Sequence, residues 1–193
     1  MNISAVLLSG GESHRMGRDK AILLFRRRPL WQIQLDRLRK LAPTEIFVSA
    51  RTDPVWRPGD VQFVADTPPS RGPLSGLAAS IAKMRATHLL ALGIDMPFMT
   101  EKYLRDLCEN IVPGCGVLPT TGHLAEPLSA VYPVEAAIEI SAALTGPDFS
   151  LQALTSRLMK SGKLRPIAIT KEQTRLFRNL NDPADLESLQ RSC

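Results

Sequence analysis

The sequence predicts an α/β fold, in which a mainly parallel, twisted sheet carries helices on both faces as a three-layer sandwich. Two observations predict it. Short apolar runs alternate with segments of helical spacing over the first 110 residues, and such alternation implies parallel strands joined by helices. One apolar run, 88–94, is nearly continuous, as in a strand buried on both faces of a sheet. We expect a single domain over residues 1–193.

The elements expected in the first part of the chain follow one another in order. They are strands over 3–8, 21–25, 45–49, 61–65 and 88–94, and helices between Pro29 and Pro43, over 73–85 and from Thr100 onward. Pro29 suits the first turn of a helix, where its missing N–H costs nothing. Thr100 is a residue type that caps a helix N-terminus. In the second helix Leu77, Ile81 and Met84 form one apolar face.

After residue 110 the pattern changes to shorter elements. We expect strands over 116–119, 128–132 and 166–169, and helices over 133–144, 151–159 and 183–190. Asp182 would cap the last helix, with Pro183 in its first turn. No linker separates this part of the chain from the first part, so we do not expect a separate domain. We expect it to add to the first part and to form one wall of a binding site.

Composition excludes several classes of protein. The formal net charge is +5, but only 5% of the residues are aromatic and no nucleic-acid-binding motif stands out, so we expect no nucleic-acid partner. No apolar run approaches the about 18 residues of a membrane-spanning helix, and we expect no membrane partner. The three cysteines lack C-x-x-C spacing. They fit a reducing compartment, and we expect a cytoplasmic protein.

The loop that follows the first expected strand is the most informative segment. Adjacent glycines at Gly10 and Gly11 let the backbone come close to a ligand, and inward-facing N–H groups in such a loop bind anions. Arg15 and Lys20 add two cations to this loop. The combination predicts a bound polyphosphate, although the spacing is neither a Walker A nor a dinucleotide motif. The alternative is a simple glycine turn after an edge strand.

Two acidic residues stand directly after expected strands. Asp95 follows the buried run 88–94, and Asp66 follows 61–65. The carboxyl ends of parallel strands meet at one edge, so both should lie beside the glycine loop. A carboxylate next to polyphosphate suits Mg²⁺, which is held by one or two carboxylates and by substrate phosphates. The alternatives are a capping or loop role for Asp95, and an Asx turn at Asp66 instead of a contact with a base or ribose.

Other candidates are weaker. The segment 72–76 could supply N–H groups at a helix start or form only a tight turn. The run 26–28, three arginines, reads either as a solvated turn or as a phosphate or partner contact. His88 is expected to be structural, and no Ser/His/Asp or Cys/His arrangement stands out. If the attacking group is itself an anionic phosphate, no general base is needed, and catalysis rests on positioning and charge neutralisation.

These motifs resemble those of the molybdenum cofactor guanylyltransferases, within the small nucleotidyltransferases. The signature is Leu8-Ser9-Gly10-Gly11 followed by Arg15-Met16-Gly17-Arg18-Asp19-Lys20. The likeness continues in order through Pro29-Leu30, Asp66, Gly72-Pro73-Leu74-Ser75-Gly76, Asp95-Met96-Pro97-Phe98, Glu126-Pro127-Leu128 and Asn179-Leu180-Asn181-Asp182-Pro183. It covers essentially the whole chain and implies the Rossmann-like, nucleotide-diphospho-sugar transferase type of sandwich.

The resemblance implies a role for each matching residue. Leu8, Ser9, Gly10 and Gly11 would wrap the nucleotide. Arg15 and Lys20 would hold its phosphates as catalytic residues, and Asp66 would contact the nucleoside. Asp95 would bind Mg²⁺ as cofactor and act in catalysis, with Asn181 completing the metal or substrate shell or serving only as a turn residue. Residues 1–110 would then form the nucleotide-binding half and 111–193 the acceptor-binding half.

The implied reaction is transfer of GMP from GTP to the terminal phosphate of molybdopterin or of the molybdenum cofactor, with release of pyrophosphate. Transient contacts with cofactor-synthesis or acceptor proteins would go with it. The pair Gly10 and Gly11 resembles the guanylyl enzymes, whereas cytidylyl relatives tend to have Ala-Gly. The chain departs from the family at Ser9, where Ala is common, and in 49–53, which lacks the Asn of some members. The alternatives are CTP or another phosphorylated acceptor, and a non-catalytic nucleotide-binding module.

Overall fold

The computed structural model describes residues 2–10, 19–66 and 69–180. Its strands are β1 (Ile3–Leu8), β2 (Leu24–Phe25), β3 (Arg28–Pro29), β4 (Glu45–Ala50), β5 (Gln62–Ala65), β6 (His88–Gly93), β7 (Gly116–Thr121), β8 (Leu124–Ala125), β9 (Val131–Pro133) and β10 (Leu164–Ala168). Its helices are α1 (Leu30–Arg39), α2 (Pro73–Lys83), α3 (Glu101–Glu109), α4 (Ala137–Thr145) and α5 (Leu151–Lys160). Short 3₁₀ turns are η1 (Lys20–Ile22), η2 (Pro127–Ser129), η3 (Val134–Ala136) and η4 (Thr174–Phe177).

One sheet runs through the molecule. Its order is β10-β7-β9-β6-β1-β4-β5, with β8 paired to β7, while β2 and β3 form a separate hairpin. The pairs β1–β4, β1–β6, β4–β5 and β7–β10 are parallel, and β9 is antiparallel to both of its neighbours. The strands after residue 110 thus extend the sheet of the first half through the reversed strand β9.

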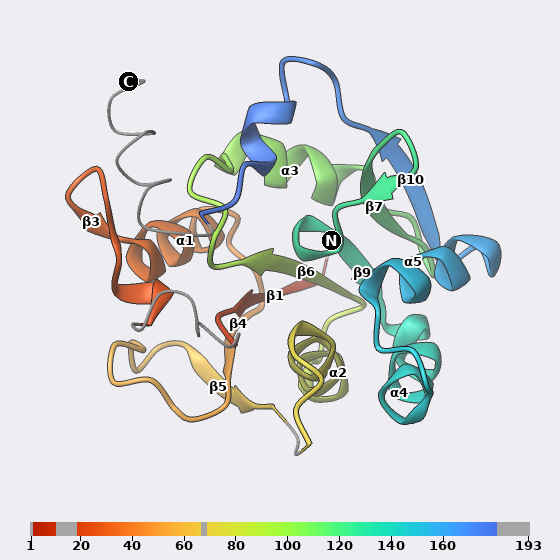
Figure 1. Ribbon diagram of the computed structural model, residues 1–193, viewed down its shortest axis with the longest axis horizontal. Coiled ribbons are helices and arrows are strands. Elements are labelled where there is room, and N and C mark those ends of the chain that lie inside the picture. Colours follow the sequence, from red (N-terminus) through yellow and green to blue (C-terminus); the bar gives the residue numbers. More distant parts are fainter. Residues whose placement is uncertain (1, 11–18, 67–68, 181–193) are drawn as a thin grey trace.

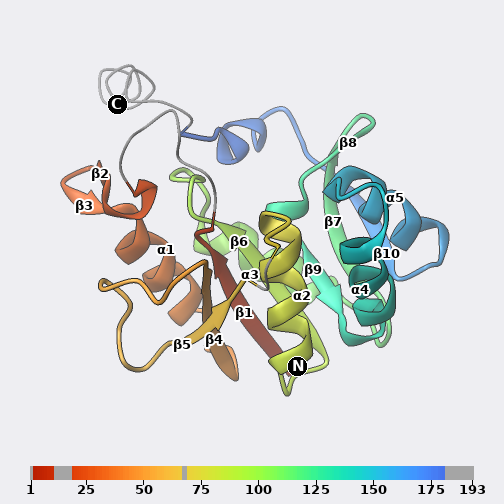
Figure 2. The same cartoon turned by 60° about the horizontal axis from the view of Figure 1, so that its bottom comes forward.

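Helices cover both faces of this sheet. The views in Figure 1 and Figure 2 show α1 and α3 on one face and α2, α4 and α5 on the other. The buried apolar residues accordingly divide into two clusters, one packed with α1 and α3 and one with the other three helices. The expected three-layer α/β sandwich is confirmed.

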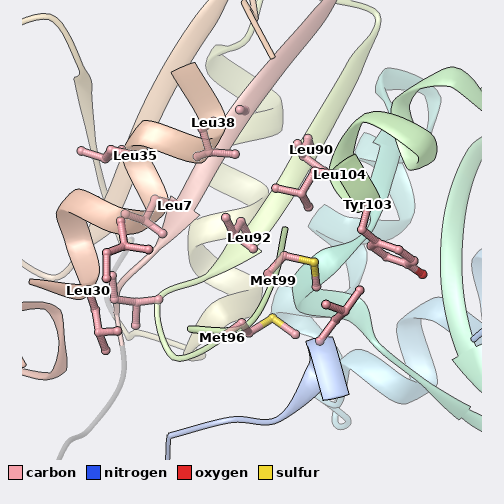
Figure 3. Close-up of a cluster of buried hydrophobic side chains, with 14 of the residues drawn as sticks. Leu7, Leu30, Leu35, Leu38, Leu90, Leu92, Met96, Met99, Tyr103 and Leu104 are labelled. Carbon is pink, nitrogen blue, oxygen red and sulfur yellow. The ribbon is translucent and has the colours of Figure 1, made fainter. Parts of the chain in front are cut away.

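Apolar side chains that alternate between the two faces of each strand contribute to both apolar clusters. In β1, Ala5 and Leu7 face α1 and α3, whereas Val6 and Leu8 face α2, because successive strand side chains point to opposite faces. All six residues of β6 are buried, which explains the nearly continuous apolar run there. Figure 3 shows side chains of the first cluster converging from the sheet and from both helices, namely Leu7, Leu30, Leu35, Leu38, Leu90, Leu92, Tyr103 and Leu104.

Several boundaries differ from the expectation. The strand expected over 21–25 is η1 followed by the short β2, because the Asp19 side chain accepts a hydrogen bond from Ala21 N at 2.9 Å and starts a 3₁₀ turn. The strand expected over 128–132 is η2 followed by β9, with Pro127 at the start of the turn. The helix expected over 133–144 begins as η3 and continues as α4. The helix expected over 183–190 lies outside the described residues.

Candidate active site

The parallel strands bring the sequence-predicted segments to one edge of the sheet. Leu8 ends β1, Asp66 directly follows β5, and Asp95 lies two residues after the end of β6. Backbone hydrogen bonds join the strand ends, with Ile94 N donating to Leu8 O at 3.1 Å and Asp66 N donating to Ala50 O at 3.0 Å. The site therefore begins where the strands β6, β1, β4 and β5 end at one edge of the sheet, as the sequence pattern predicts.

Gly10 lies directly against the side chain of Asp66. A Cβ built at Gly10 would stand 2.7 Å from Asp66 Oδ2, so any larger residue would displace this carboxylate. Asp66 is 6% exposed. Its Oδ1 accepts from Ser49 Oγ at 2.8 Å, and its Oδ2 lies 3.4 Å from the donor Ser70 Oγ. Asp66 thus forms part of the wall against which Gly10 lies.

Ser49 is a residue of this wall that the sequence reasoning did not single out. Its carbonyl accepts from Ser9 N at 3.0 Å and from Ser9 Oγ at 2.9 Å, while its hydroxyl donates to Asp66. A Cβ at Gly76 would stand 2.2 Å from Ser49 Oγ and 2.8 Å from Leu8 Cδ2. Gly76 therefore lets α2 approach the ends of β1 and β4. The signal for Ser49 was its place at the end of the apolar run 46–48.

Lys20 and Asp95 face one another across the site. Lys20 Nζ lies 3.8 Å from Asp95 Oδ2, and the side chains are 22% and 20% exposed. Leu180 joins them through its backbone: its carbonyl accepts from Lys20 Nζ at 3.1 Å, and its N–H donates to Asp95 O at 2.9 Å. Burial raises the pKa of Asp95, and the positive charge of Lys20 opposes that rise. Lys20 thus favours the ionised form of this partly buried carboxylate.

Asp19 fixes the position of Lys20. Its carboxylate caps η1, of which Lys20 is the first residue, and also accepts from Trp56 Nε1 at 2.9 Å. Trp56 in turn stacks on Trp31 with ring centroids 5.7 Å apart. The structure therefore explains why Asp19 precedes Lys20 in the motif: the carboxylate of Asp19 orients the turn that carries Lys20.

A buried glutamine holds the turn that carries Asp95. Gln34 of α1 is fully buried, and its Nε2 donates to Met96 O at 2.8 Å and to Gly93 O at 3.4 Å. A Cβ at Gly93 would lie 3.0 Å from Asp95 Oδ1, so the glycine leaves room for the carboxylate. Gln34 was not found from the sequence, because a single polar residue in an amphipathic helix has no pattern of its own.

Two weaker candidates have structural roles. Gly72 has a φ of 62°, and the N–H groups of Arg71 and Gly72 donate to Ser75 Oγ at 2.8 Å and Ser70 Oγ at 3.2 Å. These donors are used within a tight turn. His88 is buried, and its Nε2 lies 3.2 Å from Val112 O, as expected of a structural histidine.

The donor set at the edge fits Mg²⁺. The described residues contain no group of three or more His, Cys, Asp or Glu side chains that could enclose a metal ion. Mg²⁺ does not require such a cage, because one carboxylate, waters and substrate phosphates are enough. Asp95 offers a carboxylate of the right kind, and Lys20 at 3.8 Å leaves its charge only partly compensated. Gly11, Arg15 and Asn181 lie outside the described residues and stay predictions.

Comparison with known proteins decides the family. A family model described as a MobA-like NTP transferase domain matches residues 5–161. The chain belongs to this family. It is a nucleotidyltransferase, and the predicted resemblance to the molybdenum cofactor guanylyltransferases is confirmed. Among the described residues of this family member, no helix is long and apolar enough to cross a membrane.

Individual relatives of this MobA-like chain agree. It is 31% identical to a probable molybdenum cofactor guanylyltransferase of Opitutus terrae over 95% of this chain and 92% of that protein. It is 36% identical to the molybdenum cofactor guanylyltransferase of Pseudomonas fluorescens over 70% and 71%. The structure of molybdopterin-guanine dinucleotide biosynthesis protein A from Archaeoglobus fulgidus shares the fold with a TM-score of 0.76 at 22% identity, covering 99% and 98%.

Proposed function

We propose that this protein transfers GMP from GTP to the terminal phosphate of molybdopterin and releases pyrophosphate. The observation that carries the proposal is the pairing of Lys20 and Asp95 at 3.8 Å on the sheet edge where Gly10 approaches Asp66. At this edge, the ammonium group of Lys20 can bind phosphates and the carboxylate of Asp95 can bind a cation. Gly10 has no side chain, so a nucleotide can approach its backbone closely. The names of the relatives of this MobA-like chain support guanylyl transfer to the molybdenum cofactor.

The reaction in this proposal needs positioning and charge neutralisation more than proton transfer. An anionic phosphate oxygen of the acceptor forms a bond to the α-phosphorus of GTP, while the bond from that phosphorus to the bridging oxygen breaks. The electron pair leaves with pyrophosphate, and no proton has to be removed from the nucleophile. Lys20 has three N–H donors, of which one is used by Leu180 O at 3.1 Å. The other two can bind phosphate oxygens and hold the leaving group.

We further propose Mg²⁺ as the cofactor, held by Asp95. When bound, the cation supplies charge stabilisation for the phosphate oxygens of the reacting bond. The contribution of this chain is the orientation of the carboxylate: Gln34 and Leu180 fix the backbone on both sides of Asp95, and Gly93 leaves space for its Oδ1.

The proposed setting is the cytoplasm, where contacts with cofactor-synthesis or acceptor proteins would be transient. Two free thiols support it. Cys108 and Cys115 are unpaired, and burial raises the pKa of Cys108 to about 12, so this thiol stays protonated and inert at neutral pH.

The proposed function is tested by measuring pyrophosphate release from each of the four NTPs, with Mg²⁺ and molybdopterin. Release from GTP well above the other three, dependent on both Mg²⁺ and acceptor, supports the proposal. Preferential use of CTP would contradict the choice of nucleotide. Tight GTP binding without any pyrophosphate release would instead indicate a nucleotide-binding module.

A further inference from the structure

A cavity that is rich in arginine lies beside the sheet edge that carries the candidate active site. It has a volume of about 550 Å³ and lies between the β2–β3 hairpin, α1, the segment after β6 and η4. Figure 2 shows these elements around one end of the molecule. Five of the residues that line it are arginines, namely Arg26, Arg28, Arg37, Arg175 and Arg178. Lys20 and Asp95 are not among its lining residues, so it is distinct from the site of the proposed reaction.

Apart from Thr100, the other residues that line the cavity are apolar. Phe25 and Phe98 meet edge to face with ring centroids 5.2 Å apart, and Leu176 adds a third apolar side chain. Small-molecule sites typically have volumes of about 300–1000 Å³, with mostly apolar walls and a few convergent polar groups. The size and lining of this cavity therefore suit an organic molecule of roughly nucleotide size that also carries negative charge.

Of the five arginines, Arg37 is partly buried at the inner wall of the cavity, and the other four are exposed. The guanidinium of Arg37 donates to Gln34 Oε1 at 2.8 Å and to Pro97 O at 2.7 Å, and these acceptors are neutral. Burial, with the nearby charges of Arg26 and Arg28, lowers the pKa of Arg37 to about 10. Arg28 forms an ion pair with Asp36. The charges of Arg26 and Arg28 thus act on Arg37 across the cavity, and an anion bound there would be attracted by several guanidinium groups at once.

The hairpin carries arginines where its geometry favours other residues. Phe25 pairs with Arg28, so the loop between β2 and β3 consists of Arg26 and Arg27 alone. Their φ values are 51° and 63°. A two-residue turn with two positive φ values favours Asn-Gly, because most residues that carry a Cβ are strained at positive φ, Asn is tolerated there and Gly is free. Turn geometry does not explain this pair, and strain kept at such a position points to function.

We propose that this cavity is a second anion-binding site, which takes the phosphate or diphosphate group of a small organic molecule. Planar guanidinium forks match phosphate oxygens, and several of them suit an anion of more than one charge. The aromatic walls would hold the apolar part of the ligand. Such a site lies beyond the GMP transfer proposed above, which uses Lys20 and Asp95.

The first test is calorimetric titration of inorganic pyrophosphate at low ionic strength. The Lys20→Ala chain, weakened at the reaction site, should still bind pyrophosphate. Adding Arg175→Gln or Arg178→Gln should weaken this binding by about tenfold each, as expected for a lost charge-assisted hydrogen bond. Arg157→Gln removes the same charge from an exposed position on α5 that does not line the cavity, and should leave the affinity unchanged. Absent binding, or equal loss in all three variants, would overturn the proposal.

A hairpin variant separates binding from stability. Replacing Arg26 by Asn and Arg27 by Gly restores the residues that the turn favours, so the melting temperature should rise. Pyrophosphate affinity should fall, because Arg26 lines the cavity. A more stable protein with unchanged affinity would mean that the hairpin arginines do not bind anions, and would contradict the proposal.

Competition identifies the source of the phosphate group. Displacement of pyrophosphate from the Lys20→Ala chain by GMP would indicate a nucleotide, and displacement by molybdopterin would indicate the acceptor. If neither GMP, nor molybdopterin, nor any phosphorylated sugar displaces pyrophosphate, the proposal that the cavity binds an organic phosphate is wrong. Failure here is distinguishable from failure of the proposed function, since the titration does not require turnover and the pyrophosphate-release assay does not require the cavity arginines.

Discussion

Lys20 and Asp95 are far apart in the sequence, but their side chains are close in the structure. This one contact supports the roles proposed for both residues. Their side chains are each about one-fifth exposed and lie 3.8 Å apart, so the charges interact where water screens them only partly. The sequence predicted both residues, because each follows a recognisable strand or motif. It could not predict Leu180 or Gln34, since these act through backbone contacts made across long stretches of chain.

Asp95→Asn is expected to reduce turnover by orders of magnitude and GTP affinity much less. If Asp95 holds Mg²⁺, its loss acts mainly where negative charge develops on the bridging and leaving oxygens. The fold should persist, because burial already disfavours the charged carboxylate and raises its pKa. Measuring kcat, GTP affinity and melting temperature on one preparation checks all three. Near-normal turnover would reject the metal role, and a large drop in melting temperature would indicate a structural role.

Lys20→Ala should weaken GTP binding by roughly tenfold or more, since a charge-assisted hydrogen bond to phosphate is worth about 1.5–3 kcal/mol. Titration calorimetry with GTP measures this directly. A matched control is Lys102→Ala, which removes a lysine whose side chain is 85% exposed and paired with Asp106 on α3. Equal affinities of wild type and Lys20→Ala for GTP would contradict the role of Lys20.

At the scale of elements, regular patterns were predictable and short irregular pieces were not. The spacing of apolar residues predicted β1, α2 and β6. Thr100 caps α3, as expected, because its side chain accepts a hydrogen bond from Tyr103 N at 3.2 Å. The hairpin β2–β3 was expected as a strand and a turn, because two-residue strands have no periodicity. The reversed strand β9 depends on pairing with both β6 and β7, which local sequence does not encode.

Gly76→Ala tests how closely α2 must approach the sheet. The new Cβ would stand 2.2 Å from Ser49 Oγ and 2.8 Å from Leu8 Cδ2, so the helix must shift or Ser49 must leave Asp66. Overpacking of this kind costs about 1–3 kcal/mol. A lower melting temperature and weaker GTP binding are expected together. Gly59→Ala is the control, because nothing lies within 4 Å of its added Cβ. Equal melting temperatures for the two variants would show that the approach is not tight.

At the scale of the whole molecule, one continuous sheet links the predicted halves. The carboxyl ends of β1, β5 and β6 carry the candidate site, whereas the amino ends carry structural contacts. There Glu45, at the start of β4, accepts from Ser4 Oγ at 3.0 Å and from Arg85 N at 2.9 Å. Glu45 thereby ties β1, β4 and the segment after α2 together, far from the reaction edge.

This tie predicts a defined acid dependence of stability. Burial of Glu45 opposes its ionisation, but hydrogen bonds from Arg85 and Ser4 outweigh burial and lower its pKa below 4.5. A group with a depressed folded pKa stabilises the protein above its unfolded pKa, and this contribution is lost as the pH falls through the folded pKa. Glu45→Gln should therefore lower the melting temperature at neutral pH, and its difference from wild type should shrink below about pH 4.5. Melting curves of both proteins between about pH 3 and pH 7 measure this difference. A difference that stays constant over this range would show that the ionised carboxylate of Glu45 contributes nothing specific to the fold.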